Sequence, residues 1–301
     1  MSTPRITSSR IHRGVLSDLN DIATRVSRTQ LKLSSGKEIL RPSDDPAGTG
    51  RALGLRTELD GLAQFRRSTS DAQGWTAATD TALGTVTDIA QRARELLLTG
   101  ANGTMSTSQR AVIADEIDQL VASAKDTGNA NYAGRSLFAG TATSTKPYGT
   151  ASDAYLGDSG DMVRSIGPGV SVMVNARGSD VLGNGADGKL LNTLRDISAH
   201  LRGGTPADQT ALTSTDIVSI DRSIDVVLDA RAKIGSIANR LSSADDRLAE
   251  LQENAKSLLS NTEDADMAST IVDYSTQQAV YQSALRAGAG IVQSSLLDFL
   301  R

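Results

Sequence analysis

The feature that most constrains this chain is a three-four spacing of apolar and small residues, sustained over stretches that contain no proline. The longest run extends from Ile217 to Leu259. Residues at alternating steps of three and four share one side of an α-helix, so the run predicts a long helix that packs against other helices. Its positions are Ile217, Ile220, Ile224, Val227, Arg231, Ile234, Ala238, Leu241, Asp245, Leu248, Gln252, Ala255 and Leu259.

Two earlier stretches carry the same spacing and predict an antiparallel helix pair. No proline occurs from Ala47 to Leu98, which predicts one long helix. A turn follows at residues 100–105, and Ser106 with Gln109 then forms a capping box that begins a second helix. The spaced residues are Ala72, Trp75, Thr79, Ala82, Val86, Ile89, Ala93 and Leu96, then Ile113, Ile117, Leu120 and Ala124.

Both ends of the chain carry heptad helices, and the C-terminal one is poor in apolar residues. We expect that helix to begin at a capping Thr262. Its spaced positions include Gln278, Gly288 and Ser295, and each missing Leu forgoes roughly 1.5–3 kcal/mol of burial. We therefore expect this helix to become ordered when subunits assemble. The predicted assembly seam is Val15, Leu19, Ile22, Val26 and Leu33 with Met267, Ile271, Tyr274, Tyr281, Leu285, Val292 and Phe299.

Two segments interrupt the helical pattern. Residues Pro42, Ser43, Asp44, Asp45 and Pro46 predict an ordered connector, because the prolines oppose helix and the polar side chains can bond to nearby backbone. From Asn131 to Gly188 the chain is glycine-rich, and Ser171 to Asn175 alternates at period two, which predicts a small antiparallel β insertion. A short helix, Leu190 to Leu201, should follow it.

The expected fold is mainly α. It is an elongated bundle of long antiparallel helices, with paired terminal heptad helices and a small β-rich insertion. The terminal coiled-coil domain combines the helix and connector of residues 1–46 with the helix of residues 261–301. A helical rod domain is formed by residues 47–130 and 190–260, and the outer insertion is residues 131–189.

Charge and composition limit the possible partners. Residues 1–41 carry eight basic and three acidic side chains, a net charge of +5, whereas residues 261–301 carry a net charge of −3. The two ends are therefore electrostatically complementary. Nucleic-acid binding is disfavoured because stacking aromatic residues are missing from the basic end. The chain has no cysteine, which excludes disulfides and thiolate metal sites, and it has no apolar signal segment in its first thirty residues.

Only weak signals for catalysis are present. Gly157 to Gly160 resembles the nucleophile segment of serine proteases around Ser159, but the two histidines, His12 and His200, lie in no base motif. A hydrolase centred on Ser159 is the remote alternative, and we predict no enzyme activity and no cofactor.

Two further polar patterns are interpreted structurally. The acidic cluster from Glu263 to Asp266 lacks calcium-loop spacing, so we interpret it as a capping feature and predict no metal site, with a weak cation site as the minority alternative. Asn102-Gly103-Thr104 matches a glycosylation sequon, but a turn is the simpler interpretation.

Several separated motifs resemble the bacterial flagellin superfamily, in the order found there. The prolines of the connector resemble those of the hook-associated branch of this superfamily. Filament flagellins, which are the alternative assignment, usually carry alanines at these positions. The motifs are Leu33 to Lys37, Pro42 to Gly48, Asn131 to Gly140, Tyr155 to Asp158, Glu263 to Ala268 and Ser295 to Leu300.

The resemblance implies a secreted structural subunit of the flagellum. It implies export in an unfolded state by the flagellar type III apparatus, after storage on an export chaperone. The subunits would then form a self-assembled ring at the hook–filament junction, between hook-associated protein 1 and flagellin, and this ring would be required for motility. The terminal helices would line the inner tube, with the insertion facing outward.

Overall fold

The computed structural model describes the backbone of residues 4–299 and the side chains of residues 10 and 13–289. Its contacts divide the chain into two compact units, which are described separately. Unit 1 comprises Met1–Gly61 and Gln252–Arg301, and unit 2 comprises Leu62–Leu251. The long helices α2 (Pro46–Gly100) and α7 (Thr215–Glu263) contribute residues to both units. The mainly helical class with a small β insertion is confirmed.

Unit 2 is built on one hydrophobic core. Its helices are the shared parts of α2 and α7 with α3 (Thr107–Gly128), α5 (Leu190–Gly203) and α6 (Pro206–Thr213). Every spaced residue predicted for α2 is buried, as are Ile220, Val227, Ile234 and Leu241 of α7. The three-four spacing therefore correctly identified the side of each helix that faces the core. The largest buried side chains include Trp75, Leu83, Leu97, Ile117, Leu191 and Leu194.

Ion pairs join α2 and α7 along the border of this core. Arg94 contacts Asp221 at 2.5 Å, and Arg231 contacts Asp80 at 3.2 Å. Because these side chains are partly exposed, each pair contributes about 0–1 kcal/mol. Arg231, a polar member of the predicted seam, is half-buried, so it reaches this pair from the core side of its helix.

The insertion contains two separate two-stranded antiparallel sheets. The first pairs β1 (Asn131–Tyr132) with β2 (Arg135–Ser136), and the second pairs β3 (Val163–Gly167) with β4 (Val170–Met173). A single helical turn, α4 (Gly178–Val181), follows. The antiparallel arrangement is as predicted, but much of the insertion is irregular. Buried polar groups order it instead.

Tyrosine hydroxyls and one asparagine satisfy the backbone inside the insertion. Tyr148 is 1% exposed and its hydroxyl donates to the Gly183 carbonyl at 2.8 Å. The Tyr155 hydroxyl donates to the Phe138 carbonyl at 2.8 Å. The Val174 amide still bonds to the Met162 carbonyl, and the side chain of Asn175, predicted as a strand residue, then accepts from the Met162 amide and donates to the Gly160 carbonyl.

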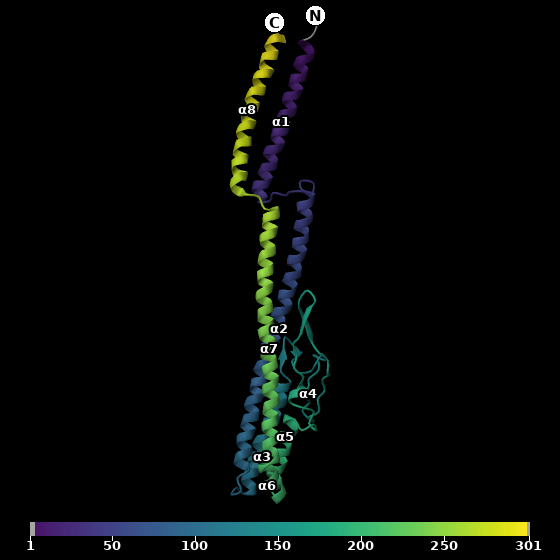
Figure 1. Ribbon diagram of the computed structural model, residues 1–301, viewed down its shortest axis with the longest axis vertical. Coiled ribbons are helices and arrows are strands. Elements are labelled where there is room, and N and C mark those ends of the chain that lie inside the picture. Colours follow the sequence, from purple (N-terminus) through teal and green to yellow (C-terminus); the bar gives the residue numbers. More distant parts are fainter. Residues whose placement is uncertain (1–3, 300–301) are drawn as a thin grey trace. The chain divides into compact units, whose positions relative to one another are not determined.

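Unit 1 contains the helix pair α1 (Pro4–Ser35) and α8 (Met267–Phe299). Figure 1 shows the first turn of α1 beside the last turn of α8. The predicted start of the C-terminal helix at Thr262 is wrong, because Thr262 lies in the last turn of α7 and its hydroxyl bonds to the Leu258 carbonyl. The cap of α8 is Asp266, whose carboxylate accepts from the Ala268 amide at 2.9 Å.

The structure contains a helix that the sequence did not predict. The segment after Gly204, expected only as a polar approach to the long helix, forms α6 with a Thr205–Asp208 capping box. Among the described residues, none of the helices is both long enough and apolar enough to span a membrane.

The core side of α7 should dominate the stability of unit 2. Leu241→Ala removes a side chain with 0% exposure and should lower the free energy of unfolding by about 2–5 kcal/mol. Leu228→Ala is the matched control on the same helix, since Leu228 is 44% exposed, and it should cost less than about 1 kcal/mol. Urea denaturation measures both. Equal losses in the two variants would contradict the assignment of the core side.

Candidate assembly surface

The facing side of the α1–α8 pair contains the predicted N-terminal seam. Val15, Leu19, Ile22, Val26 and Leu33 are all half-buried. A Cβ atom at Gly288 would lie 3.4 Å from a Val15 methyl group and 3.6 Å from a Leu19 methyl group, so this glycine packs against the apolar seam of α1 at ordinary contact distance.

The C-terminal seam is only partly brought to this interface. Tyr274 and Tyr281 are half-buried, whereas Met267, Ile271 and Leu285 are 42%, 50% and 44% exposed. The side chains of Val292 and Phe299 lie outside the described residues. The α8 residues that face α1 are Thr270, Tyr274, Gln277, Tyr281, Ala284 and Gly288.

Sequence reasoning missed Thr270, Gln277 and Ala284, although they continue the three-four spacing one position earlier. Thr270 is 5% exposed. The Thr29 hydroxyl donates to the Gln277 side-chain carbonyl at 2.8 Å across the pair. Both spacings fit one helix, and the more polar of the two faces α1. The contribution of α8 to the interface is therefore polar and small, and the more apolar side of α8 remains exposed.

We call the exposed apolar residues of α8 the outer stripe: Met267, Ile271, Val272, Val280 and Leu285. Helical spacing places Met267, Ile271 and Leu285 on one side and Val272 with Val280 on another. Single exposed apolar residues are ordinary, but a row along a helix indicates surface for further helices. On α1, Leu16 and Leu31 are likewise 61% and 50% exposed.

The connector is ordered by its two aspartates. The Asp44 carboxylate accepts from the Arg41 amide at 3.0 Å and pairs with Arg28 at 3.1 Å. Asp45 caps α2, because its carboxylate accepts from the Gly48 amide at 2.9 Å. Pro46 then occupies the first helical position, where no amide hydrogen is needed. Pro42 and Ser43 are exposed in the intervening turn.

A group of ion pairs that we call the clasp joins Lys37, which follows α1, and Arg56 of α2 to the end of α7 and the residue after it. Lys37 contacts Glu263 at 2.5 Å and Asp264 at 2.6 Å, and Arg56 contacts Glu263 at 2.5 Å. Backbone bonds run from the Glu38 amide to the Glu263 carbonyl and from the Ala265 amide to the Gly36 carbonyl. The two backbone segments around Lys37 and Asp264 are therefore joined both by backbone hydrogen bonds and by ion pairs.

The clasp changes the protonation equilibria of its members. Hydrogen bonds to Asp264 and then Glu263 raise the pKa of Lys37, and the bond from Lys37 lowers the pKa of Asp264. The Glu263 side chain is only 7% exposed, so its charge depends on Lys37 and Arg56 for compensation. The expected role of the acidic cluster as helix caps is thus correct for Asp266, while Glu263 and Asp264 have a different role.

Removing one charge from the clasp should loosen the connector. Glu263→Gln leaves two cations without their shared partner and should lower local stability by about 1–2 kcal/mol, since Lys37 and Arg56 are partly exposed. Hydrogen exchange at the Glu38 and Ala265 amides should accelerate. Glu253→Gln is the control, because Glu253 is exposed on α7 and forms no ion pair in the described chain. Unchanged protection in the Glu263 variant would refute the clasp.

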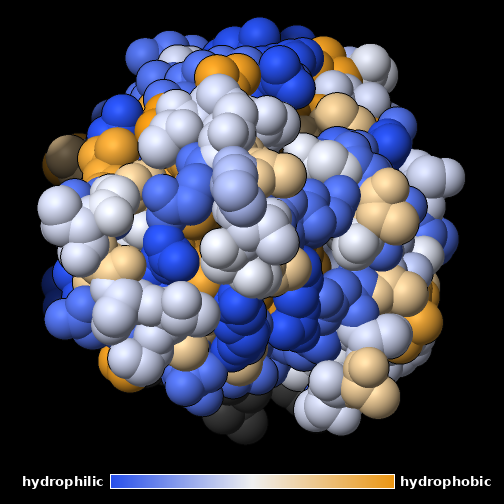
Figure 2. All heavy atoms as spheres, turned by 90° about the horizontal axis from the view of Figure 1, so that it is seen from below, coloured by the Kyte–Doolittle hydropathy of each residue, from blue (hydrophilic) through white to orange (hydrophobic). Residues whose placement is uncertain are grey.

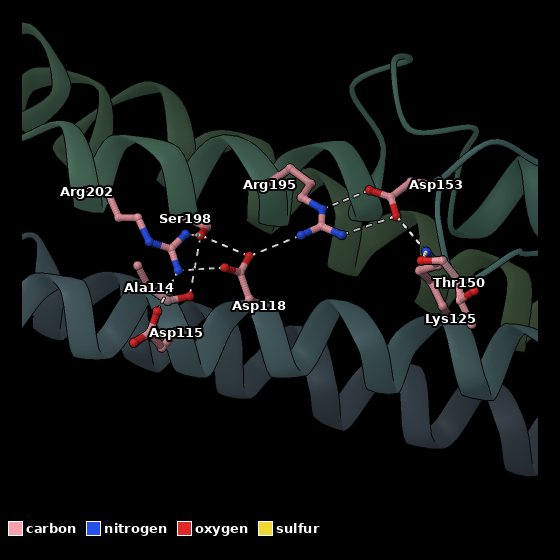
Figure 3. A network of polar contacts seen from close by, with 9 residues as sticks. All are labelled: Ala114, Asp115, Asp118, Lys125, Thr150, Asp153, Arg195, Ser198 and Arg202. Carbon is pink, nitrogen blue, oxygen red and sulfur yellow. Dashed lines mark hydrogen bonds and ion pairs between the residues drawn. The ribbon is translucent and has the colours of Figure 1, made fainter.

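A second polar network fastens the insertion to the helices of unit 2 (Figure 3). The Lys125 ammonium of α3 donates to the Ser152 carbonyl at 2.9 Å and contacts Asp153 at 3.0 Å. Arg195 of α5 contacts Asp153 at 2.9 Å and Asp118 at 3.2 Å. Arg202 extends the row by pairing with Asp118 and Asp115. Asp153 is therefore the member that connects the loop to two helices.

Acid should weaken the attachment of the insertion at Asp153 to α3 and α5. The hydrogen bond from Arg195, followed by that from Lys125, lowers the pKa of Asp153. A carboxylate with a lowered folded pKa stabilises the fold above its unfolded pKa, near 3.8, and this stabilisation is lost as pH falls through the folded value. Asp153→Asn should therefore reduce the fall in stability that the parent protein shows below about pH 4.

Asp126→Asn is the matched control for the acid experiment. Asp126 is exposed on α3, and within the described part of the chain its carboxylate forms no hydrogen bond or ion pair. Its variant should keep the parent's pH dependence of the unfolding midpoint. An Asp153 variant that also kept it would show that the loop is held by other contacts.

Ser159 lies in an exposed turn without a catalytic partner. Among the described residues its hydroxyl makes no hydrogen bond, and Asp158 beside it accepts from the Thr141 and Gly160 amides. His200 pairs instead with Asp216 at 2.7 Å. The side chain of His12 lies outside the described residues. Within the described part of the chain, no group of three or more His, Asp or Glu side chains is placed to hold a metal ion.

Comparison with known proteins matches both ends of the chain to flagellin models. Residues 12–143 match the bacterial flagellin N-terminal helical region, and residues 217–300 match the bacterial flagellin C-terminal helical region. Flagellar hook-associated protein 3 of Escherichia coli is 27% identical, over 85% of this chain and 87% of that protein. The flagellar filament 30.7 kDa core protein of Treponema maltophilum is 28% identical, over 89% and 90%.

A solved structure gives a likeness of the fold as well as of the sequence. A candidate flagellar hook-associated protein from Vibrio parahaemolyticus is 25% identical and superposes with a TM-score of 0.66. The match covers 73% of this chain and 100% of that one.

Proposed function

The chain belongs to the bacterial flagellin family, and we propose that within this family it is the structural subunit that joins the flagellar hook to the filament. This is the role of hook-associated protein 3 (FlgL). The likeness to the Escherichia coli and Vibrio parahaemolyticus hook-associated proteins supports the junction role, as do the prolines of the connector. The filament core protein of Treponema maltophilum has about the same sequence identity to this chain, so a filament subunit remains the second candidate function.

The observation that carries an assembly role is the outer stripe of α8. Inside the subunit, α8 turns its polar and small side toward α1 and leaves Ile271 and Leu285 at 50% and 44% exposure. Covering such a half-exposed side chain yields about 1 kcal/mol, roughly half of the value for full burial, so neighbouring subunits gain burial that the single chain does not provide. A terminal helix pair completed by its neighbours suits a ring of identical subunits.

The proposed partners follow from the position of the ring between the hook and the filament. On one side the ring would contact hook-associated protein 1, and on the other side flagellin, with copies of this chain filling the ring. Before assembly the chain would be held by a flagellar export chaperone and secreted unfolded through the type III export apparatus. The incomplete apolar burial of the α1–α8 pair supports this, because a weakly stable end unfolds at low cost.

The clasp would give the ring a defined joint. Lys37, Glu263 and Arg56 fix where the connector leaves α1 and where α8 begins. Repeated subunits must present the same surface to identical neighbours, so the joint has to be reproducible. The paired backbone bonds at Glu38 and Ala265 provide that reproducibility.

Deletion of the gene in the source bacterium separates the two candidate functions. For a junction subunit, we expect complete hooks without filaments, with unassembled flagellin released into the medium. Electron microscopy and immunoblotting of the culture supernatant measure this outcome. Hooks whose junction proteins remain while the filament protein itself is lost would instead identify a filament subunit.

The deletion strain also tests the outer stripe directly. The double variant Ile271→Asp with Leu285→Asp should be exported but should reduce filament number by about tenfold or more, since it places charge on surface meant for burial. Thr276→Asp with Ser283→Asp is the matched control, because both residues are exposed polar positions on the opposite side of α8 from Ile271 and Leu285. Normal filaments in the stripe variant would refute the assembly role of this side.

A further inference from the structure

The turn between α2 and α3 contains an exposed asparagine whose side-chain oxygen is held by two hydrogen bonds. The Asn102 side-chain oxygen accepts two hydrogen bonds from one residue, at 3.2 Å from the Thr104 amide and at 3.0 Å from the Thr104 hydroxyl. Asn102, Gly103 and Thr104 are all exposed. Figure 2 views the molecule from below, and hydrophilic residues (blue) and residues of intermediate hydropathy (white) make up most of the surface that it shows.

The residue after Asn102 supplies a potential nucleophile. Gly103 has no side chain to obstruct its backbone nitrogen, and among the described residues this nitrogen donates no hydrogen bond. A side chain at Gly103 would meet only the Gln209 oxygen, at 3.9 Å, so the segment has room to move. The backbone nitrogen of a following glycine can therefore approach the carbonyl carbon of the asparagine side chain.

We propose that Asn102 is a site of spontaneous deamidation and that Thr104 promotes the reaction. The Gly103 nitrogen attacks Asn102 Cγ, its proton passes to the leaving amide nitrogen, and the Cγ–Nδ2 bond breaks to release ammonia. Water then opens the resulting cyclic imide and leaves either aspartate or isoaspartate at position 102. No oxidant or reductant is needed, because one amide is exchanged for one carboxyl group.

Thr104 acts on the charge that develops during the attack. The tetrahedral intermediate places negative charge on the Asn102 side-chain oxygen, which is the atom that accepts both Thr104 hydrogen bonds. Donors already placed at a developing oxyanion lower the barrier without further reorganisation. The turn thus resembles an oxyanion hole of two donors, built from a single residue.

The second Asn-Gly pair of the chain, Asn184–Gly185, provides an internal comparison. Its asparagine oxygen accepts only one bond, from the Ala186 amide at 3.1 Å. Gly185 is held at φ +84°, and a side chain there would lie 2.9 Å from Asp153 Cβ. The Asp187 carboxylate accepts from the Asn184 amide at 3.1 Å, so a negative charge already lies nearby. Packing and charge both oppose attack at this second pair.

The two products should affect the turn differently. An aspartate at position 102 still accepts both Thr104 bonds, because a carboxylate offers the same acceptors. Isoaspartate inserts a methylene into the backbone and separates the Asn102 carbonyl from the Met105 amide, which bond at 3.1 Å. Either product adds a negative charge to this exposed end, and the fraction converted rises with the age of the subunit.

Incubation of the purified full-length protein at neutral pH tests the proposal. Peptide mass spectrometry over time should show conversion of Asn102 at least about tenfold faster than that of Asn184 in the folded protein. In denaturant, where both turns are lost, the two rates should become similar. Equal rates in the folded protein, or the same tenfold ratio in denaturant, would overturn the proposal.

Substitutions separate the part played by each residue. Thr104→Val removes the hydroxyl donor and should slow conversion about threefold or more, whereas Thr104→Ser keeps both donors and should leave the rate unchanged. Gly103→Ala should slow it most, because the reaction passes through that nitrogen. Circular dichroism confirms that each variant is folded. Thr104→Val at the parental rate, or rapid conversion in Gly103→Ala, would refute the mechanism.

Discussion

The burial of one side of α7 against the rest of unit 2 is the constraint on which the structure depends. Val227 and Leu241 are wholly buried on that side, and ion pairs such as Arg231–Asp80 border it. Fixing a long helix costs conformational entropy at every residue, and only a continuous apolar side offsets that cost. The insertion is then attached to a stable support, through Asp153 with Lys125 and Arg195.

The terminal helix pair follows a different rule. Thr270 and Gly288 face α1, while Ile271 and Leu285 remain exposed. The apolar seam of α1 therefore packs against small and polar residues of α8, and the exposed apolar residues of α8 are left for other subunits. One side of α8 thus contacts α1 within the subunit, and another side remains available to other subunits. This arrangement agrees with membership of the flagellin family.

Within unit 1, charged groups join the end of α1 to the end of α7. Glu263 is nearly buried and satisfied by Lys37 and Arg56, while Asp44 and Asp45 order the connector on the other side. Buried charges are costly when unpaired, so a joint made from them tolerates few alternative geometries. A flexible apolar joint would allow many.

The sequence by itself determined which side of α2, α3 and α7 is buried, where the connector and the insertion lie, and the family. It could do so because helical spacing, prolines and glycines act locally. The partners of Glu263 and Asp153, and the choice between the two spacings of α8 that meet at Tyr274 and Tyr281, were decided only by the tertiary structure. The reason is physical: both spacings satisfy the same helix, and only the side chains of α1, far away in the chain, distinguish them.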